Sequence, residues 1–569
     1  MQYLLRVDVS TRQIIYQPVP EAYQTLGGRI LTGRILLDEV KPTIEPLGKN
    51  NKLVFATGLL AGTPVSSSGR LSIGAKSPLT KGIKESNSGG TLAARLAQMD
   101  IKALIVEGLP EDRSASILVI EPEGSRLIPA EEYGEMGVYA FAESMREQFP
   151  DASVACIGPA GNRLYNAAGI AVTDKDGCPS RYCGRGGLGA VMGAKGLKGV
   201  IIPQKGKGRV VHEDAFNDAF KRFSRILKDA PSTKAYKELG TAAMLDRVNS
   251  LCGLPTRNFS QGVFEKADDI NAQALIKNIS DRGGDGRQSH ACMPGCLIQC
   301  SNVYVDRKGK TIVAPLEYEN MALLGSNLGI GDLDEIARLN WHCNDIGVDT
   351  IEMGAALGVA IEAGLASFGD AGGALNLLEE VREGTPLGRV LGNGAGITGE
   401  VFGVLNVPVV KNQAMPGYDP RAIKGMGVTY LTTAMGADHT AGPTARAEVD
   451  HASPQDQADL SLKIQKLIAM FDCSGLCLFC IGAMAPNPEL VLDLVNARFG
   501  WDKDLDWLNN MYLEMMRIEQ EFNRRAGFTK LDNRFNEAFT QRKLPELGTV
   551  FDVPDEEIDR IIDSICKDT

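Results

Sequence analysis

The chain has 569 residues, a length that allows roughly two to four domains with deep apolar cores. A hydrophobic content of 44% and a charged content of 23% exclude a disordered or fibrous protein. A formal net charge of −11, with no basic stripe that carries aromatic residues, argues against nucleic-acid binding. The N-terminus lacks the regions of a signal peptide, and the longest apolar run, 476–486, is too short for a membrane span, so we expect a cytoplasmic protein.

Short strands separated by glycines are predicted up to about residue 208. Runs rich in valine and isoleucine predict strands at Leu53–Thr57, Ala103–Val106, Ala115–Ile120 and Val200–Ile202. No repeat of a fixed solenoid period is present.

A helical period follows this β-rich part. One helix is predicted to begin at Glu213, and its apolar face is marked by Phe216, Phe220, Phe223 and Leu227. Further helices are predicted at Leu333–Asn344, Thr350–Ala363, Leu375–Glu383, Gln457–Phe471 and Leu505–Arg525, and a last one after Pro554. The fold class is therefore α+β, with a β-rich N-terminal base domain over 1–208 followed by two mainly helical domains over 209–405 and 406–569.

Three closely spaced cysteines, Cys292, Cys296 and Cys300, are answered much later in the chain by Cys477. Three close thiolates and one distant thiolate form the ligand set of a cubane iron–sulfur cluster. Structural zinc is the alternative, but zinc sites usually come as two close pairs. A disulfide framework is disfavoured, because thiols stay reduced in a long acidic chain without a secretion signal. Spacing alone does not distinguish Cys477 from Cys473 and Cys480 as the fourth ligand.

Two segments echo each other, and each follows a predicted helix: Asn344-Asp-Ile-Gly-Val-Asp349 and Asp472-Cys-Ser-Gly-Leu-Cys477. The glycine in each permits a turn with positive φ, so the side chains on either side would point at one object. A carboxylate at such a place suits the N–H groups of a heterocycle. The pair indicates two pseudo-equivalent half-sites around one ligand.

The string Gly184-Arg-Gly-Gly-Leu-Gly189 matches the dinucleotide fingerprint G-x-G-x-x-G. Residues 179–183 before it do not read as a strand, and the strand after it ends in Gln204-Lys205 rather than in an acid that could bind a ribose. The loop N–H groups and Arg185 are instead suited to a phosphate, with a tight structural turn as the alternative.

Four further polar positions are candidates. Asn87 lies in a polar glycine stretch, 85–90, where it would contact a phosphate or magnesium, and Arg70 lies shortly upstream. His439 is one of only five histidines and lies in a glycine-rich loop suited to proton transfer. Glu319 is the matching carboxylate.

Together these motifs resemble the tungsten-containing aldehyde:ferredoxin oxidoreductase family over essentially the whole chain. In chain order the resemblance is carried by Ser68–Arg70, Ser86–Gly90, Gly184–Lys195, the cysteine trio, Tyr318-Glu319, Gly436–His439 and Asp472–Cys477. It implies two pterin dithiolenes that hold one tungsten, phosphates linked to Mg²⁺, and a [4Fe–4S] cluster beside one pterin. Tungsten and molybdenum are not distinguished by the sequence.

The resemblance also implies roles for single residues. The phosphates and Mg²⁺ would be served by Arg70, Asn87, Gly89, Arg185 and Gly186. The pterin ring edges would be held by Asn344, Asp349, Asp472, Gly475 and Leu476, with Asn344 where an aspartate is common. The cluster would be held by Cys292, Cys296, Cys300 and Cys477.

Besides Asn344, two further departures from the family pattern stand out. The cysteine trio reads C-x3-C-x3-C where the family usually has C-x2-C-x3-C, and we expect Pro294-Gly295 to absorb the extra residue. The E-x-x-H motif that some members use at a dimer interface is missing near Glu335, which argues against an iron-bridged homodimer and leaves other homo- or hetero-oligomers open.

The resemblance implies oxidation of an aldehyde by water to a carboxylic acid, with electrons leaving through the cluster to ferredoxin or a small iron–sulfur subunit. Glu319 would activate an oxygen nucleophile and His439 would relay the proton, while Tyr418 is a further pocket candidate. One alternative is a low-potential reductase subunit acting on an acyl or aromatic substrate. Another is an iron–sulfur electron-transfer subunit that binds no tungsten.

Overall fold

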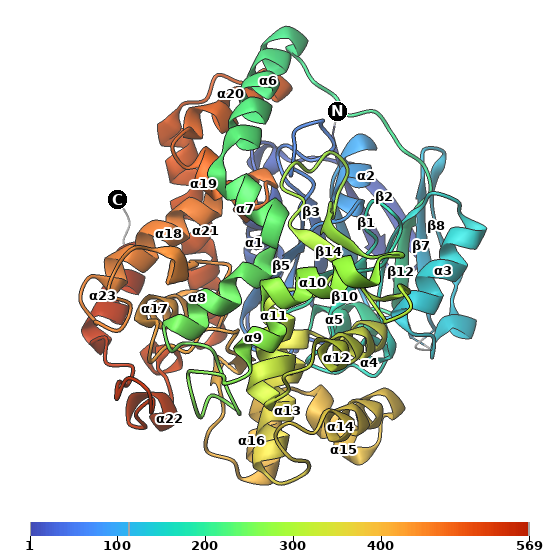
Figure 1. Ribbon diagram of the computed structural model, residues 1–569. Helices are drawn as coiled ribbons and strands as arrows, with labels where there is room; N and C mark the ends of the chain where they lie inside the picture. The colour runs from blue at the N-terminus through green and yellow to red at the C-terminus, as the bar shows by residue number, and fades with distance from the viewer. Residues whose placement is uncertain (1, 112–113, 567–569) are drawn as a thin grey trace.

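The computed structural model describes residues 2–111 and 114–566, and its base is formed by two six-stranded sheets (Figure 1). The first sheet contains β1 (Tyr3–Asp8), β2 (Gln13–Pro18), β3 (Leu53–Thr57), β4 (Leu71–Lys76), β5 (Ile83–Ser88) and β6 (Ile101–Glu107). The second contains β7 (Ser116–Glu121), β8 (Gly124–Pro129), β9 (Ser153–Cys156), β10 (Ile170–Val172), β11 (Arg181–Cys183) and β12 (Leu197–Ile202). The four strands predicted from the sequence are confirmed.

The two sheets share one topology. Their orders are β2-β1-β6-β3-β4-β5 and β8-β7-β12-β9-β10-β11, and in each only the pairing of the first strand with the sixth is parallel. The helices correspond as well, α1 (Gly28–Glu39) with α3 (Val138–Gln148), and α2 (Leu92–Gln98) with α5 (Leu188–Ala194). The base is therefore an internal duplication. It was not predicted from the sequence, because its halves share a pattern of elements rather than a recurring motif.

The edge strands β5 and β11 bring the two sheets together. The expectation that residues 179–183 form no strand was wrong, since Arg181–Cys183 are β11. This strand is short and pairs antiparallel with β10 alone, so it differs from the central parallel strand that precedes a dinucleotide loop. The glycine loop after it leads into α5, at the junction of the sheets.

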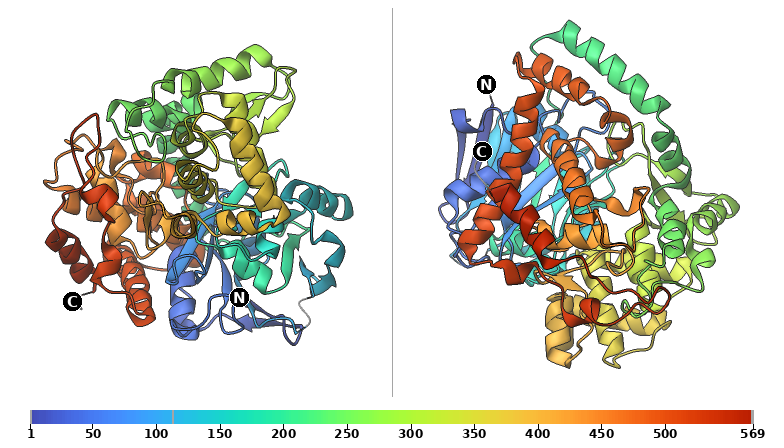
Figure 2. Two further views of the ribbon diagram at one scale, coloured as in Figure 1. Left: turned by 90° about the horizontal axis from the view of Figure 1, so that it is seen from below. Right: turned by 90° about the vertical axis from the view of Figure 1, so that its left-hand side faces the viewer.

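Helices cover this base, as Figures 1 and 2 show. The helix predicted at Glu213 is α6, with two acidic residues in its first turn and a buried face every three or four residues. The middle of the chain holds α6 (Glu213–Asp229), α7 (Pro231–Leu239), α8 (Met244–Ser250), α9 (Ala267–Ile270), α10 (Ala272–Arg282), α11 (Tyr318–Asn320), α12 (Leu333–Ile346), α13 (Thr350–Glu362), α14 (Ala371–Glu383), α15 (Pro386–Gly392) and α16 (Ala395–Phe402).

A small antiparallel sheet interrupts the helices of the middle region. Its strands are β13 (Arg287–His290), β14 (Ser301–Val305) and β15 (Thr311–Val313), in that order. The cysteine trio occupies the loop between β13 and β14. The sequence did not predict this sheet, because β13 (Arg-Gln-Ser-His) has no apolar alternation.

The last part of the chain contains the hairpin β16 (Val409–Val410) and β17 (Gln413–Ala414), followed by helices coloured orange to red in Figure 1. These helices include α17 (Lys424–Thr432), α18 (Gln457–Ser474), α19 (Ile481–Met484), α20 (Pro488–Phe499), α21 (Leu505–Ala526), α22 (Glu537–Thr540) and α23 (Asp555–Cys566). The helices predicted here and in the middle region are confirmed, whereas the domain boundaries near 208 and 405 stay predictions.

No single helix within 2–111 and 114–566 has the length and apolar character needed to cross a membrane. The pair α18 and 478–484 meets those criteria together, but it is bent by 119°.

Candidate active site at the junction of the two sheets

A cavity of about 350 Å³ lies where β5 and β11 meet. Its walls come from both sheets, from the middle helices and from the loop that holds His439. Of the residues predicted from the sequence, it is lined by Arg70, Asn87, Gly89, Arg185, Glu319, Asn344, Asp349 and His439. The remaining predicted residues lie behind this wall or beside it.

The first half-site is built on the end of α18. Gly475 ends the helix with φ +80°, as the sequence pattern predicted, and packs against Gly58 of the first sheet, where a Cβ on Gly475 would lie 2.8 Å from the Gly58 Cα. The Gly475 carbonyl accepts a hydrogen bond of 3.1 Å from the Arg70 N–H. The Arg70 guanidinium binds the side-chain oxygen of Asn87, with Nε to Oδ1 at 2.7 Å. The turn therefore fixes Arg70 and Asn87 at the cavity wall.

Asp472 supports this wall from behind. It receives Arg29 Nη1 at 3.0 Å and Asn87 Nδ2 at 3.3 Å, while Arg29 also forms a buried two-pronged ion pair with Glu519. Burial raises the pKa of Asp472, and Arg29 opposes that rise. Among the described residues, Asp472, Gly475 and the buried Leu476 do not line the cavity, and their contacts to a ring edge stay a prediction.

The second half-site is built in the same way on the end of α12. Gly347 ends that helix with φ +83° and packs against Gly158 of the second sheet, 2.8 Å from a Cβ position to the Gly158 nitrogen. Two residues later Asp349 caps α13 and receives Arg185 Nε at 3.2 Å. Asn344 donates from Nδ2 to Tyr139 Oη at 3.3 Å. Both echoing segments thus form the turns that the sequence predicted.

Arg185 connects the second half-site to the C-terminal region. Its guanidinium donates to the Ala437 carbonyl at 2.5 Å and to the Ala414 carbonyl. Burial lowers the pKa of Arg185, but Asp349 and Asp438 outweigh burial and raise it, so the side chain is a fixed cation at the cavity. Gly186 follows with φ +82° and does not line the cavity. Its carbonyl accepts a hydrogen bond from Ser77 Oγ at 2.7 Å.

Glu319 and His439 meet across the cavity, although 119 residues of sequence separate them and they come from different helical regions. Glu319 Oε1 lies 3.5 Å from His439 Nε2, and Glu319 Oε2 accepts the Gly417 N–H at 2.8 Å. Glu319 Oε1 and His439 Nδ1 have no hydrogen-bond partner among the described residues. Burial raises the pKa of Glu319, and His439 limits the rise.

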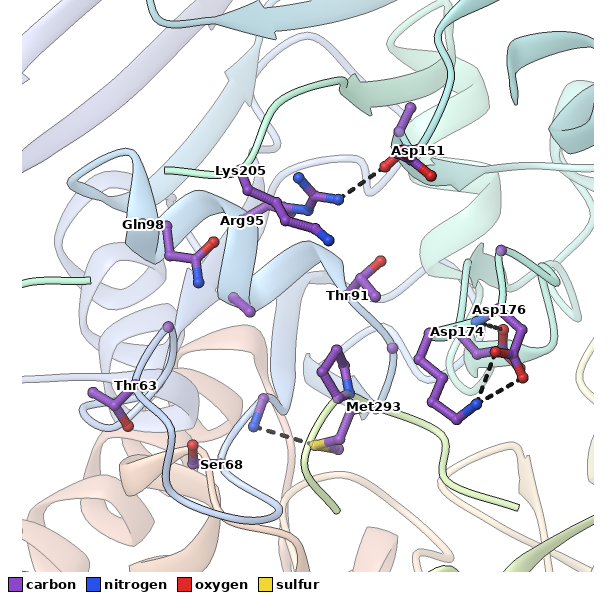
Figure 3. A pocket seen from close by; sticks show the side chains of 18 of the residues that line it. Thr63, Ser68, Thr91, Arg95, Gln98, Asp151, Asp174, Asp176, Lys205 and Met293 are labelled. Carbon is purple, nitrogen blue, oxygen red and sulfur yellow. Dashed lines mark hydrogen bonds and ion pairs between the residues drawn. The ribbon is translucent and has the colours of Figure 1, made fainter. Parts of the chain in front are cut away.

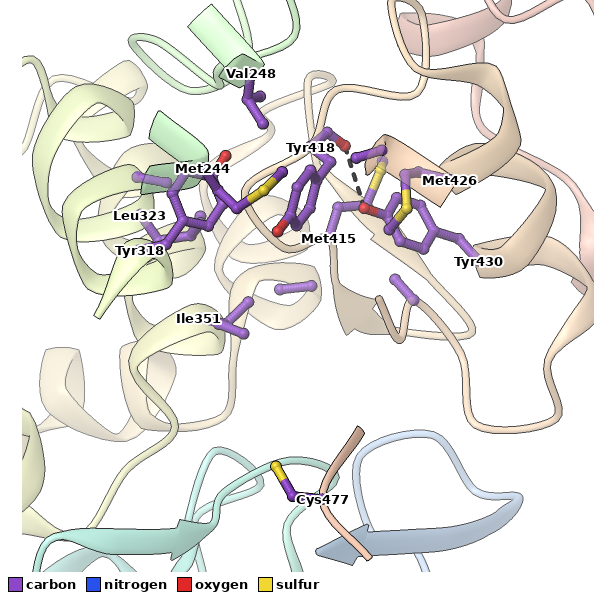
Figure 4. Packing of buried hydrophobic residues seen from close by; sticks show 14 of the residues in the cluster. Met244, Val248, Tyr318, Leu323, Ile351, Met415, Tyr418, Met426, Tyr430 and Cys477 are labelled. Carbon is purple, nitrogen blue, oxygen red and sulfur yellow. Dashed lines mark hydrogen bonds between the residues drawn. The ribbon is translucent and has the colours of Figure 1, made fainter. Parts of the chain in front are cut away.

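Tyr418 lies behind this pair rather than at the cavity wall. Its ring stacks on the His439 ring with centroids 5.8 Å apart and packs against Tyr318 at 5.2 Å. Figure 4 shows Tyr318, Tyr418 and Tyr430 gathered with methionine side chains on one side of the core. Tyr418 therefore packs against the histidine ring, and its role as a pocket residue stays a prediction.

The cysteine loop approaches the first half-site. Gly89 lies against Cys292, because a Cβ on Gly89 would be 2.9 Å from the Cys292 sulfur. Ser67 joins the two segments, with Oγ 3.4 Å from Cys296 Sγ and its carbonyl accepting the Cys477 N–H at 2.8 Å. Gly295 is exposed with φ +74°, and the absorption of the extra residue by Pro294-Gly295 stays a prediction.

The geometry narrows the choice of the fourth cysteine. Cys473 points away into the helices, with its sulfur 3.8 Å from Met515 Sδ. Cys480 stays near the group, since its N–H donates to the Cys477 carbonyl at 3.0 Å. Within the described ranges no set of three or more His, Cys, Asp or Glu side chains is arranged around a single metal ion.

Several charged residues at the cavity were missed by the sequence analysis. Lys84 and Glu85 on β5 are buried, and one oxygen of Glu85 has no hydrogen-bond partner in the described structure. Asp438 lies 3.7 Å from Lys84, which together with Arg185 keeps its pKa below the usual range despite burial. Glu352, which does not itself line the cavity, accepts the N–H groups of Ala395 and Ala414, and burial raises its pKa to about 7. The sequence signal that could have indicated them is a charged residue within a strand or helix that is otherwise buried.

The chain matches two family models that together cover nearly its whole length. Residues 4–204 match "Aldehyde ferredoxin oxidoreductase, N-terminal domain", and residues 218–565 match "Aldehyde ferredoxin oxidoreductase, domains 2 & 3". The chain therefore belongs to the aldehyde ferredoxin oxidoreductase family of oxidoreductases, as the resemblance implied.

Relatives and a solved structure agree with this assignment. The tungsten-containing aldehyde ferredoxin oxidoreductase of Pyrococcus horikoshii is 30% identical over 95% of this chain and 92% of its own length. The WOR-like subunit of the aliphatic sulfonate oxidoreductase of Pyrococcus furiosus is 25% identical over 91% of this chain and 85% of its own. The active-site complex BamBC of benzoyl coenzyme A reductase shares the fold, with a TM-score of 0.80, 18% identity, and coverage of 99% of this chain and 93% of that one.

Proposed function

We propose that the chain oxidises an aldehyde with water to a carboxylic acid at a tungsten centre held by two pterins, and passes the electrons through a [4Fe–4S] cluster to an iron–sulfur partner. The observation that carries the proposal is the meeting of Glu319 and His439 at one cavity whose wall includes residues of both half-sites. The family assignment supports it, since the Pyrococcus relatives are tungsten-containing aldehyde ferredoxin oxidoreductases.

The cavity residues fit a large anionic cofactor. Arg70, Arg185 and Lys84 present positive charge suited to phosphates, and Asn87 offers an amide oxygen that suits Mg²⁺. The orphaned oxygen of Glu85 and the partly engaged carboxylate of Asp349 are suited to the N–H groups of a pterin. When bound, the tungsten–pterin group would supply the two-electron redox chemistry, with molybdenum as the alternative metal. Gly89 and Gly186 would leave room for close backbone approach.

Cys292, Cys296, Cys300 and Cys477 are the proposed cluster ligands. Ser67 joins their two segments. Gly89 lines the cavity and also packs against the Cys292 sulfur. A cluster there would lie directly beside the first half-site, so the electron path from the cofactor would be short. Zinc stays the alternative occupant of the thiols.

Glu319 and His439 would handle the protons. Oxidation of R-CHO by H₂O to R-COOH releases two electrons and two protons, so a base must take the first proton from the oxygen nucleophile. Glu319 Oε1 is free of hydrogen bonds, and the raised pKa of this carboxyl makes it a stronger base than an exposed glutamate. His439, 3.5 Å away, accepts the proton and moves it outward.

A hollow of about 320 Å³ borders the cysteine loop on the outer side and is the proposed docking face for the electron acceptor (Figure 3). Met293 and the exposed Pro294 line it, next to Arg95, Arg146 and Lys205. Asp151, Asp174 and Asp176 also line the hollow, but the side chains of Arg146 and Lys205 form no hydrogen bond or ion pair with any described residue, so their charge is available to an acidic iron–sulfur protein.

The low-potential reductase is the second candidate, and the likeness to benzoyl coenzyme A reductase concerns the fold alone. Anaerobically purified protein should contain tungsten and four irons per chain, and it should reduce a viologen dye with acetaldehyde or benzaldehyde. Reduction of an acyl substrate by reduced viologen, without aldehyde oxidation, would establish the reductase instead. Iron without tungsten or molybdenum would establish the electron-transfer subunit.

A further inference from the structure

Arg181 spans the two ends of the cysteine loop. It lies on β11, the edge strand of the second sheet, and it is buried at the cavity wall with 9% of its surface exposed. Its Nη2 donates to Ser301 Oγ at 2.8 Å and lies 3.5 Å from His290 Nδ1. Ser301 directly follows Cys300, and His290 lies two residues before Cys292. The guanidinium of this second-sheet residue therefore contacts the residues that flank both ends of the cysteine trio.

The protein leaves part of this guanidinium unsatisfied. Arg181 Nε is buried without a hydrogen-bond partner in the described structure. Its terminal nitrogens form long ion pairs, Nη2 with Asp174 at 3.9 Å and Nη1 with Glu317 at 4.0 Å, and neither pair involves Nε. Asp174 is already engaged by the N–H groups of Asp176 and Cys178. A buried donor of this kind indicates an acceptor that the polypeptide does not itself supply.

Arg181 is a buried cation in contact with residues that flank the cysteine trio. Burial lowers the pKa of Arg181, but Cys292 and Asp174 act against burial and the net direction is upward. A positive charge near thiolates stabilises the more negative, reduced form of a cluster and so raises its reduction potential.

We propose that Arg181 is the cation that sets the reduction potential of the iron–sulfur cluster, with its Nε–H donated to the cluster side of the cavity. This inference rests on the proposed function, because it requires the cluster on Cys292, Cys296, Cys300 and Cys477. It assigns the second sheet a direct role in electron transfer, although the cluster ligands come from neither sheet.

The test is an EPR-monitored redox titration of the holoenzyme. Arg181→Gln, with iron content unchanged, should shift the cluster midpoint to a more negative potential, and Arg181→Lys should restore part of the shift. Asp174→Asn removes a negative charge 3.9 Å from Arg181 and should shift the midpoint the opposite way. The control is Arg287→Gln, because this exposed arginine of β13 pairs with Asp176 rather than facing the thiols.

A wild-type midpoint in an iron-replete Arg181→Gln enzyme would overturn the proposal. If that variant does not assemble the cluster, Arg181→Lys and Asp174→Asn decide, and an unshifted or negatively shifted Asp174→Asn enzyme overturns it. Absence of a cluster signal from the wild-type protein would instead refute the proposed function. The two failures are therefore distinguishable.

Discussion

Gly58 of the first sheet receives the turn at Gly475, and Gly158 of the second sheet receives the turn at Gly347. The two seats are alike in geometry, because each places a helix end with positive φ against a glycine that follows a central strand. Their chemistry differs, since the first turn leads to the thiol of Cys477 and the second leads to the carboxylate of Asp349. The duplication thus provides two supports of the same geometry. The helical segments that pack on them carry different side chains, so the two sites differ in chemistry.

The ion pairs around the two turns differ as well. Asp472, at the first turn, is fixed by the buried Arg29–Glu519 ion pair. Asp345, at the second, pairs with the partly exposed Arg382 and receives the Tyr139 N–H at 3.2 Å. The ion pairs next to the cysteines are therefore more deeply buried than the pair at the second turn. An electron path that must keep fixed distances is expected on that side.

The largest effect is expected where the two half-sites converge. Glu319→Gln keeps the shape but removes the base, so aldehyde turnover should fall by roughly two to four orders of magnitude. Aldehyde turnover by His439→Asn should also fall, but by less. Because burial raises the pKa of Glu319, wild-type turnover should rise with pH through a pKa above the ordinary value for glutamate. Glu319→Gln should lose that limb of the pH profile.

Metal analysis of the two variants shows whether a loss of turnover comes from lost proton transfer or from lost metal. Tungsten and iron should stay at wild-type levels in both variants, since neither side chain is a proposed cluster ligand. Full turnover by metal-replete Glu319→Gln would contradict the proposed proton transfer by Glu319 and His439.

The next largest effect is expected at the first turn, because only this turn carries a proposed cluster ligand. Cys477→Ser should lose the iron–sulfur absorbance, whereas Cys473→Ser should keep it, because Cys473 contacts Met515 instead. Cys480→Ser should also keep it, and this is the sharper control since Cys480 stays near the thiol group. Asp349→Asn at the equivalent turn should leave iron unchanged. Loss of iron from Cys480→Ser alone would move the fourth ligand to Cys480.

The two glycine seats are expected to give unequal results. A Cβ at Gly58 would overlap the Gly475 backbone, and a Cβ at Gly158 would overlap the Ile346 carbonyl. Each alanine variant should lose about 1–3 kcal/mol of stability, because the neighbouring backbone must move. Only Gly58→Ala should also lose iron, measured by iron content after purification in parallel. Equal iron loss in both variants would contradict the asymmetry of the two sides.

The smallest effect concerns the acceptor. Lys205→Glu should raise the KM for an acidic ferredoxin by roughly three- to tenfold, and Arg146→Glu should do the same, because rim charges act mainly on association. Rates with a viologen dye should not change. Lys463→Glu on an exposed position of α18 is the matched control. An unchanged KM in both hollow variants would place the docking face elsewhere.

Local chemistry made part of this site predictable from the sequence. The two glycine turns followed from helix periodicity and the need for positive φ, and the cysteine trio from ligand spacing. The meeting of Glu319 with His439 needed the tertiary fold, because no local signal joins two residues from different helical regions. Arg181 was missed since its short edge strand carries no apolar alternation.

The most direct test of the central claim is a single addition of acetaldehyde or benzaldehyde to anaerobic, metal-replete enzyme without an acceptor, followed by EPR. The account predicts that the signal of a reduced [4Fe–4S] cluster develops in the wild type, and that in Glu319→Gln it develops roughly a hundredfold or more slowly. Enzyme with full tungsten and iron that shows no cluster reduction by either aldehyde would contradict the account.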